Sequence, residues 1–137
     1  MILENVTALY AGMLAILMAV LSIRVPMRRA QIDQPWSSGT DTILDGRIRK
    51  FGNFSEYVPI MLFLMWLVED IGGNSVTIHI AGVSLIAVRI IHAVFLKPGI
   101  LTTIDKIGRG IGSMGTWLIL VFLAISLLKL TFGNSVT

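Results

Sequence analysis

The sequence contains no cysteine, which limits the chemistry that its own side chains can perform. It excludes a disulfide framework, a thiolate metal ligand and a protein thiol nucleophile. Charge is also scarce, since only 14% of the 137 residues are charged, whereas about 25% is usual in soluble domains. A surface with so little charge does not face water alone, so the composition argues against an ordinary soluble globule.

Apolar residues make up 55% of the chain and gather in four stretches. A helix needs about 20 mostly apolar residues to cross a bilayer. The first stretch has no basic residues before it and no small-residue cleavage site after it, so we interpret it as a span and not as a signal peptide. We predict an all-α membrane protein, a single domain over residues 1–137 folded as a four-helix transmembrane bundle, with spans at about 6–24, 55–71, 75–96 and 110–132.

The basic residues lie almost entirely on one side of these spans. Segment 24–53 holds six Lys or Arg residues and segment 97–110 holds three, out of eleven in the chain. By the positive-inside rule this side is cytoplasmic. We therefore predict a multi-pass protein of the cell membrane with both termini outside the cytoplasm. Topology also explains the net charge of +3, so no nucleic-acid partner is expected.

A stripe of polar residues lies where the second span begins. On a helix, Arg49, Asn53 and Glu56 fall at i, i+4 and i+7 on one face, with Tyr57 beside them. A guanidinium, an amide, a carboxylate and a phenol at the membrane boundary form a candidate binding site. The alternative is an Arg–Glu pair at the interface that binds nothing, although such a pair requires neither the amide nor the phenol.

The helix that carries this stripe is predicted to begin outside the membrane. Residues 31–40 are rich in turn formers and indicate a loop, after which Thr40 or Asp41 can cap the helix. Pro59 removes a backbone hydrogen bond from the helix interior and is expected to kink it.

A second polar pair, Arg89 and His92, lies late in the third span at i, i+3 spacing. An arginine within the membrane is costly and favours a functional role. The alternative is that Arg89 reaches the interface about two turns away and that His92 is structural. Because the connection between the second and third spans is short, this pair can lie beside the stripe at a similar depth.

Glycines are concentrated where the fourth span begins, and their spacing matches Gly-x-Gly-x-x-Gly at 110–115. No strand precedes this segment and an apolar span follows it, so a dinucleotide site is not indicated. Gly108 and Gly112 instead predict close helix packing, and Arg109 beside them is a candidate site residue. With two histidines at opposite ends of one span, no metal site is expected.

The run Arg49-xxx-Asn53-xx-Glu56-Tyr57-x-Pro59, at the start of the second of four spans, resembles the signature of the MAPEG family. These are the membrane-associated proteins in eicosanoid and glutathione metabolism, which include the microsomal glutathione transferases. The resemblance extends over the whole chain, including the arginine and histidine late in the third span. The segment around Arg109 looks like that of prokaryotic members.

This resemblance implies a homotrimer that binds glutathione between adjacent subunits near the cytoplasmic face. Arg109 is the expected thiol-activating residue and Lys106 is the alternative, because the loop before the fourth span differs in length from that of eukaryotic members. Arg28 or Arg29 is expected to reach the ligand of the neighbouring subunit. The resemblance places six further residues around the tripeptide: Arg49, Asn53, Glu56, Tyr57, Arg89 and His92, the last where eukaryotic members often have tyrosine.

The expected activity is that of a microsomal-type glutathione S-transferase, with glutathione peroxidase activity as a second activity. The family implies an acceptor that arrives from the lipid bilayer, either a hydrophobic electrophile or a lipid hydroperoxide, in a detoxification reaction. Two alternatives stay open. One is a non-catalytic glutathione- or lipid-binding membrane protein of the same fold. The other is a small four-helix transporter, which would require a carboxylate deep within a span.

Overall fold

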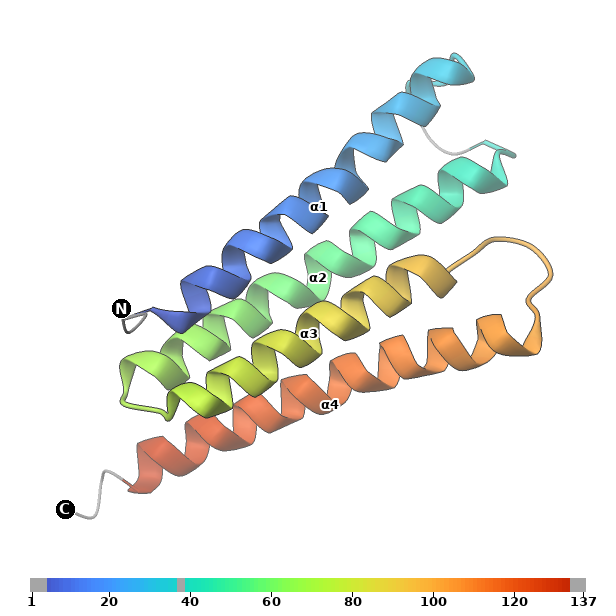
Figure 1. Cartoon of the computed structure of the whole chain (residues 1–137). Helices are drawn as coiled ribbons and strands as arrows, with labels where there is room; N and C mark the ends of the chain where they lie inside the picture. The colour runs from blue at the N-terminus through green and yellow to red at the C-terminus, as the bar shows by residue number, and fades with distance from the viewer. Residues whose placement is uncertain (1–4, 37–38, 134–137) are drawn as a thin grey trace.

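The computed structural model describes residues 5–36 and 39–133, and they form a bundle of long helices (Figure 1). The helices run alternately in opposite directions, so α1 begins and α4 ends at the same end of the bundle. The prediction that this end lies outside the cytoplasm stays a prediction. In chain order the helices are α1 (Val6–Gln31), α2 (Thr42–Asp70), α3 (Ser75–Phe95) and α4 (Thr103–Gly133).

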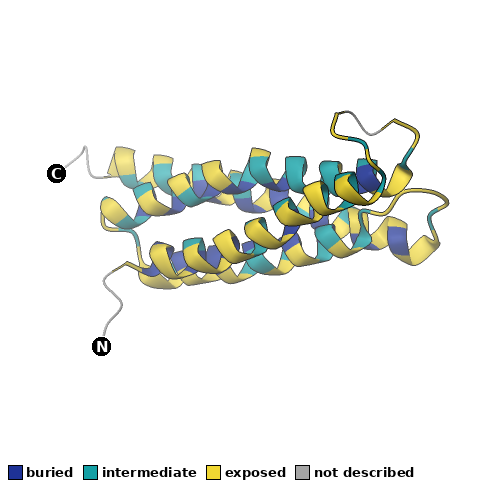
Figure 2. Cartoon of the chain, turned by 90° about the horizontal axis from the view of Figure 1, so that it is seen from above, coloured by how far each residue is buried: buried dark blue, intermediate teal, exposed yellow. Residues whose placement is uncertain are grey.

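Each of these helices is long and apolar enough to cross a membrane. Only a third or less of the most apolar part of each is buried inside the bundle. Figure 2 shows that buried residues lie between the helices and exposed residues cover the outer faces. Large apolar side chains on those outer faces include Ile16, Phe63 and Trp117. A protein that exposed so much apolar surface to water would aggregate. The outer faces are therefore suited to contact with lipid chains.

α1 and α4 extend beyond their predicted spans, while α2 begins before its span, as predicted. The first span is predicted to end near residue 24, but α1 continues through Pro26 to Gln31. The fourth is predicted from 110, but α4 begins at Thr103, because Thr102 and Asp105 cap it reciprocally. The Asp105 backbone N–H donates to Thr102 Oγ1 at 3.2 Å, and the Thr102 N–H donates to Asp105 Oδ2 at 3.2 Å. α2 is one continuous helical element through Pro59.

The carboxylate of Glu69, near the end of α2, caps the beginning of α1. It accepts hydrogen bonds from the backbone N–H groups of Val6 and Thr7, the latter at 2.9 Å. The first N–H groups of a helix have no partner within it, and the helix dipole favours a negative charge there. Glu69 therefore joins α1 to α2 at the end of the bundle where the chain begins.

Asp41 joins the same two helices at the opposite end. It is one of the two predicted caps of α2, and it accepts from the Leu44 backbone N–H. Its carboxylate also binds Arg28 of α1, with Nη2 to Oδ2 at 2.7 Å and Nε to Oδ1 at 3.3 Å. One carboxylate thus starts α2 and holds the extended end of α1 against it.

Glycines bring α3 and α4 into close contact, as the spacing predicts. A Cβ added at Gly112 would lie 2.7 Å from the Cβ of His92, and one added at Gly108 would lie 2.3 Å from the ring of Phe95. Both distances are too short for real atoms, so only glycine allows the two helices to approach this far.

We expect Gly112→Ala to lower the free energy of unfolding by about 1–3 kcal/mol, because the new methyl group forces α3 and α4 apart. Gly110→Ala on the same helix is the matched control, since a Cβ there has nothing within 4 Å. It should stabilise the helix by about 0.5–1 kcal/mol. Thermal unfolding of both variants in one detergent measures the difference, and equal effects would contradict the close packing.

Acid should weaken the connection between α1 and α2. The hydrogen bond from Arg28 and then the Leu44 N–H hold the pKa of Asp41 below its ordinary value of 3.8. A lowered pKa in the folded state stabilises the fold above the unfolded pKa, and this stabilisation is lost as the pH falls through the folded pKa. Thermal midpoints measured from pH 6 down past this ordinary pKa should therefore fall more for the wild type than for Asp41→Asn. Parallel curves would contradict this assignment.

Candidate functional site

Arg89 lies on the inner face of α3 and is only 2% exposed. Its Nη2 donates to Asn53 Oδ1 of α2 at 2.8 Å, and its Nη1 donates to Thr116 Oγ1 of α4 at 3.3 Å. The guanidinium carbon lies 5.4 Å from the centre of the Phe54 ring. The side chain therefore turns into the bundle, about 20 Å along α3 from its first residue, and does not reach out to the interface.

The partners of Arg89 leave its charge uncompensated. Its Nε is buried and has no hydrogen-bond partner. Among the described residues, the ion pairs are Arg28–Asp41, Arg49–Asp45 and Lys97–Asp105, none of which involves Arg89. An unpaired charge away from water is costly. Neutral oxygens and one aromatic face stabilise it only in part, so this position favours an anionic group nearby.

The stripe on α2 divides into an inner and an outer pair. Asn53 reaches Arg89, and Tyr57 is half-buried and close enough to interact electrostatically with it. Arg49 and Glu56 are exposed. The alternative of an Arg–Glu pair is not observed, because Arg49 Nε binds Asp45 Oδ2 at 3.1 Å, one turn earlier on the same helix. Within one chain, the structure therefore brings together only half of the predicted stripe.

His92 is buried one turn after Arg89 and packs against α4 at Gly112. The positive charges of Arg89, Arg109 and Lys50 all act on this imidazole. Basic side chains from three helices thus surround the end of α3. The prediction that the Arg89 pair and the α2 stripe lie at one depth is confirmed by the bond to Asn53.

A cavity of about 330 Å³ opens between the start of α2 and the segment that joins α3 to α4. Arg49 of α2 and Arg109 of α4 both line this cavity. Arg109 is exposed and also lines a neighbouring hollow of about 300 Å³ together with Lys106. The structure therefore places Arg109, and not Lys106, in the cavity that Arg49 lines.

Arg28 and Arg29 have intramolecular roles in the single chain. Arg28 binds Asp41, as described above. Arg29 Nη1 donates to the carbonyl oxygens of Gln34 and Pro35 at 3.4 and 3.0 Å. Both arginines thus order the segment after α1, of which residues 37 and 38 lie outside the described part. Their predicted contact with a neighbouring subunit stays a prediction.

Sequence reasoning missed two neighbours of Arg89. Thr116 follows Gly112 by four residues, so it continues the line of small residues on the face of α4 that packs on α3. That spacing was a signal that could have identified it. Phe54 directly follows Asn53, but nothing in the sequence distinguishes it from the other apolar residues of α2.

Comparison with known proteins gives two related findings. The model of the MAPEG family matches residues 7–129. The inner membrane protein YecN of Escherichia coli strain K12 is 37% identical over 87 residues, which cover 64% of this chain and 66% of that protein. YecN of Escherichia coli O6:H1 strain CFT073 matches to the same extent. The matched region is thus just under two thirds of the length of these relatives. No solved structure matches.

Asn53→Ala should lower the free energy of unfolding by about 1–3 kcal/mol, because it leaves a second N–H of a buried guanidinium without a partner. Glu56→Ala is the matched control on the same helix. It is exposed and should change stability by no more than about 0.5 kcal/mol. Thermal unfolding without ligand compares the two, and a similar loss in both would show that the bond to Arg89 is not a stabilising contact.

Proposed function

The chain belongs to the MAPEG family, and from its site we propose that it is a membrane-bound glutathione S-transferase. It would activate the thiol of glutathione for attack on a hydrophobic electrophile. The observation that supports this most is the buried, uncompensated Arg89 cation, whose neutral partners come from two neighbouring helices. Two more arginines line a cavity at the same end of the bundle.

The chemistry of glutathione suits these groups. At neutral pH the tripeptide carries two carboxylates and one ammonium. Arg49 can hold a carboxylate with two parallel hydrogen bonds, and its exposed pair with Asp45 is weak enough to be exchanged. Glu56 can accept from the ammonium, while Asn53 and Tyr57 orient the peptide. In this proposal Arg89 supplies the fixed positive charge behind them.

Arg109 is the proposed thiol-activating residue. A free thiol has a pKa of about 8.5 and is mostly protonated at pH 7. A guanidinium at hydrogen-bond distance stabilises the thiolate, and each unit by which it lowers the pKa corresponds to about 1.4 kcal/mol. The thiolate forms a bond to the electrophilic carbon, the leaving group departs with its electron pair, and the thiol proton passes to water.

The same thiolate would account for a peroxidase activity. It attacks an oxygen of a lipid hydroperoxide, so that the O–O bond breaks and an alcohol leaves with one proton. The product on sulfur is a sulfenic acid. A second glutathione then reduces it to the disulfide and releases water, which balances the reaction.

The site requires a second copy of the chain. Arg49 and Glu56 belong to the proposed binding set, yet both are exposed on a single protomer. A neighbouring protomer packed on this side of α2 would cover them and enclose the ligand. We therefore include the homotrimer in the proposal, with Arg28 or Arg29 contributed from the adjacent subunit.

The activity is tested with purified full-length protein, glutathione and a chlorodinitrobenzene acceptor. Arg49→Ala should weaken glutathione binding about 10- to 100-fold, as expected for the loss of a charge-assisted hydrogen-bond pair. Arg109→Ala should lower the turnover rate and raise the thiol pKa, which appears as a lost thiolate absorbance. Lys106→Ala tests the alternative thiol-activating residue, and Lys129→Ala is the control.

The outcomes of this experiment distinguish the transferase from a non-catalytic binding protein, and Arg109 from Lys106. No glutathione binding by the wild type would refute the proposal. Binding without turnover or thiolate would favour a non-catalytic binding protein of the same fold. A thiolate signal that is lost in Lys106→Ala but kept in Arg109→Ala would transfer the thiol-activating role to Lys106.

A further inference from the structure

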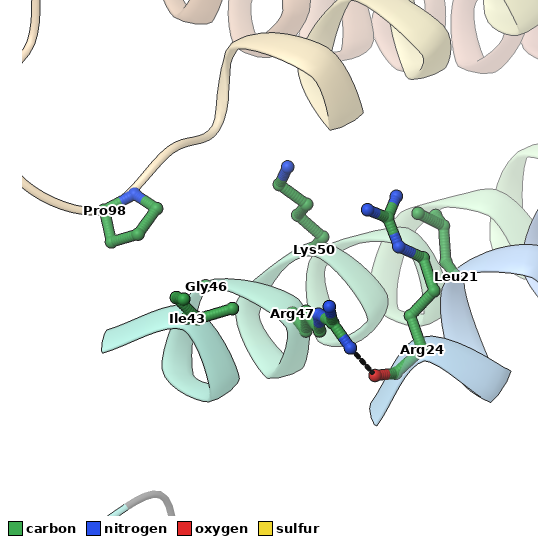
Figure 3. Close-up of a pocket in the computed structure, with 7 residues that line it drawn as sticks. All are labelled: Leu21, Arg24, Ile43, Gly46, Arg47, Lys50 and Pro98. Atoms are coloured by element: carbon green, nitrogen blue, oxygen red, sulfur yellow. Dashed lines mark hydrogen bonds between the residues drawn. The ribbon is translucent and has the colours of Figure 1, made fainter. Parts of the chain in front are cut away.

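A second cavity, of about 160 Å³, lies between α1, α2 and the segment that follows α3. Three basic side chains line it: Arg24 of α1 with Arg47 and Lys50 of α2 (Figure 3). In Figure 3 the Lys50 ammonium and the Arg24 guanidinium extend to the same side from neighbouring helices. Arg47 Nη1 donates to the backbone carbonyl of Arg24 at 2.7 Å, which holds the Arg47 side chain against α1.

No carboxylate in the described part of the chain forms an ion pair with these three cations. Asp41 lies within electrostatic reach of Arg47, but its carboxylate is already bound by Arg28 and the Leu44 N–H. The charge on Lys50 is opposed by the positive charges of Arg24, Arg47 and Lys97. The cavity therefore gathers like charges that repel one another.

The positive-inside rule explains why these residues lie at this end of the bundle, but not why they converge. Long basic side chains at a surface can reach water separately, which keeps their mutual repulsion low. Here a hydrogen bond from Arg47 to the backbone of Arg24 joins two of the three residues, and all three line one cavity. Such an arrangement is stabilised when an anion occupies the cavity.

We propose that this cavity binds a phosphate-bearing anion. Guanidinium groups match the oxygens of phosphate with paired hydrogen bonds, and an ammonium adds a compact positive charge. The phosphate can belong to a lipid headgroup or be free in solution. The rim carries the apolar side chains of Leu21 and Ile43, and basic pockets between membrane helices are suited to anionic headgroups.

This site is separate from the proposed glutathione cavity. Pro98 packs on Gly46, where an added Cβ would lie 3.1 Å from the proline ring. The two residues line both cavities, so they form the wall between them. Arg49 and Arg109 lie on one side, and Arg24, Arg47 and Lys50 lie on the other. The proposal does not depend on the transferase activity.

The test is a titration of the purified full chain in neutral detergent with three probes: short-chain phosphatidylglycerol, short-chain phosphatidylcholine and inorganic phosphate. Calorimetry gives the dissociation constants. Lys50→Gln and Arg24→Gln should each weaken binding of the anionic probe about fivefold, as expected for one basic residue near a headgroup. Lys50→Arg should retain binding, and Lys129→Gln, the same substitution outside the cavity, should leave it unchanged.

The probes distinguish the sources of the phosphate. Binding of phosphatidylglycerol without inorganic phosphate assigns the cavity to a lipid headgroup, whereas binding of both assigns it to phosphate as such. Equal binding of the two lipids, no binding of either phosphate source, or the same loss in Lys50→Gln and Lys129→Gln would overturn the proposal. The unfolding midpoint of each variant without ligand shows whether a loss of binding comes from a loss of folding.

Discussion

The hydrogen bonds of Arg89 connect three helices at one depth in the bundle. A positive charge in an apolar interior is tolerated only where polar partners surround it, and here α2 supplies Asn53 while α4 supplies Thr116. These contacts fix the register of α2 and α4 against α3. The helix packing, the position of the stripe on α2 and the location of the neighbouring cavity all depend on that register.

Close contact between α3 and α4 makes this arrangement possible. Gly112 brings the backbone of α4 against His92, and Thr116 lies one turn further along the same face. The hydroxyl of Thr116 donates to the Gly112 carbonyl at 2.7 Å. This bond orients the Thr116 oxygen so that it accepts the hydrogen bond from Arg89. α1 and α2 are joined differently, by the carboxylates of Glu69 and Asp41 at opposite ends of the pair. Close packing at glycine therefore joins α3 and α4, whereas contacts of charged side chains join α1 and α2.

Two groups of basic residues line separate cavities at the end of the bundle opposite the first residue of α1. One includes Arg49 and Arg109, which line the cavity of about 330 Å³ and support the proposed glutathione site. The other surrounds the smaller cavity behind Pro98. Lys97 does not add a free charge to either cavity, because its ammonium binds Asp105 Oδ1 at 2.9 Å. The excess of cations at this end is therefore divided between two cavities, and a count of charges does not reveal that division.

The sequence by itself determined the number of helices and their alternating direction, because the length of the apolar stretches and the need to match a bilayer leave few alternatives. It offered Thr40 and Asp41 as caps of α2, and the resemblance of the motif on α2 indicated the family. The sequence also indicated that the Arg89 pair can lie beside the α2 stripe at a similar depth. Only the tertiary structure decided that Arg49 turns to Asp45, that Thr116 and Phe54 complete the surroundings of Arg89, and that Glu69 caps α1 from another helix. For Arg89 and Glu69 the physical reason is that their contacts depend on the rotation and closeness of packed helices and join residues far apart in the sequence. The Arg49–Asp45 pair is local, but the sequence offers Arg49 two acidic partners on the same helix and does not choose between them.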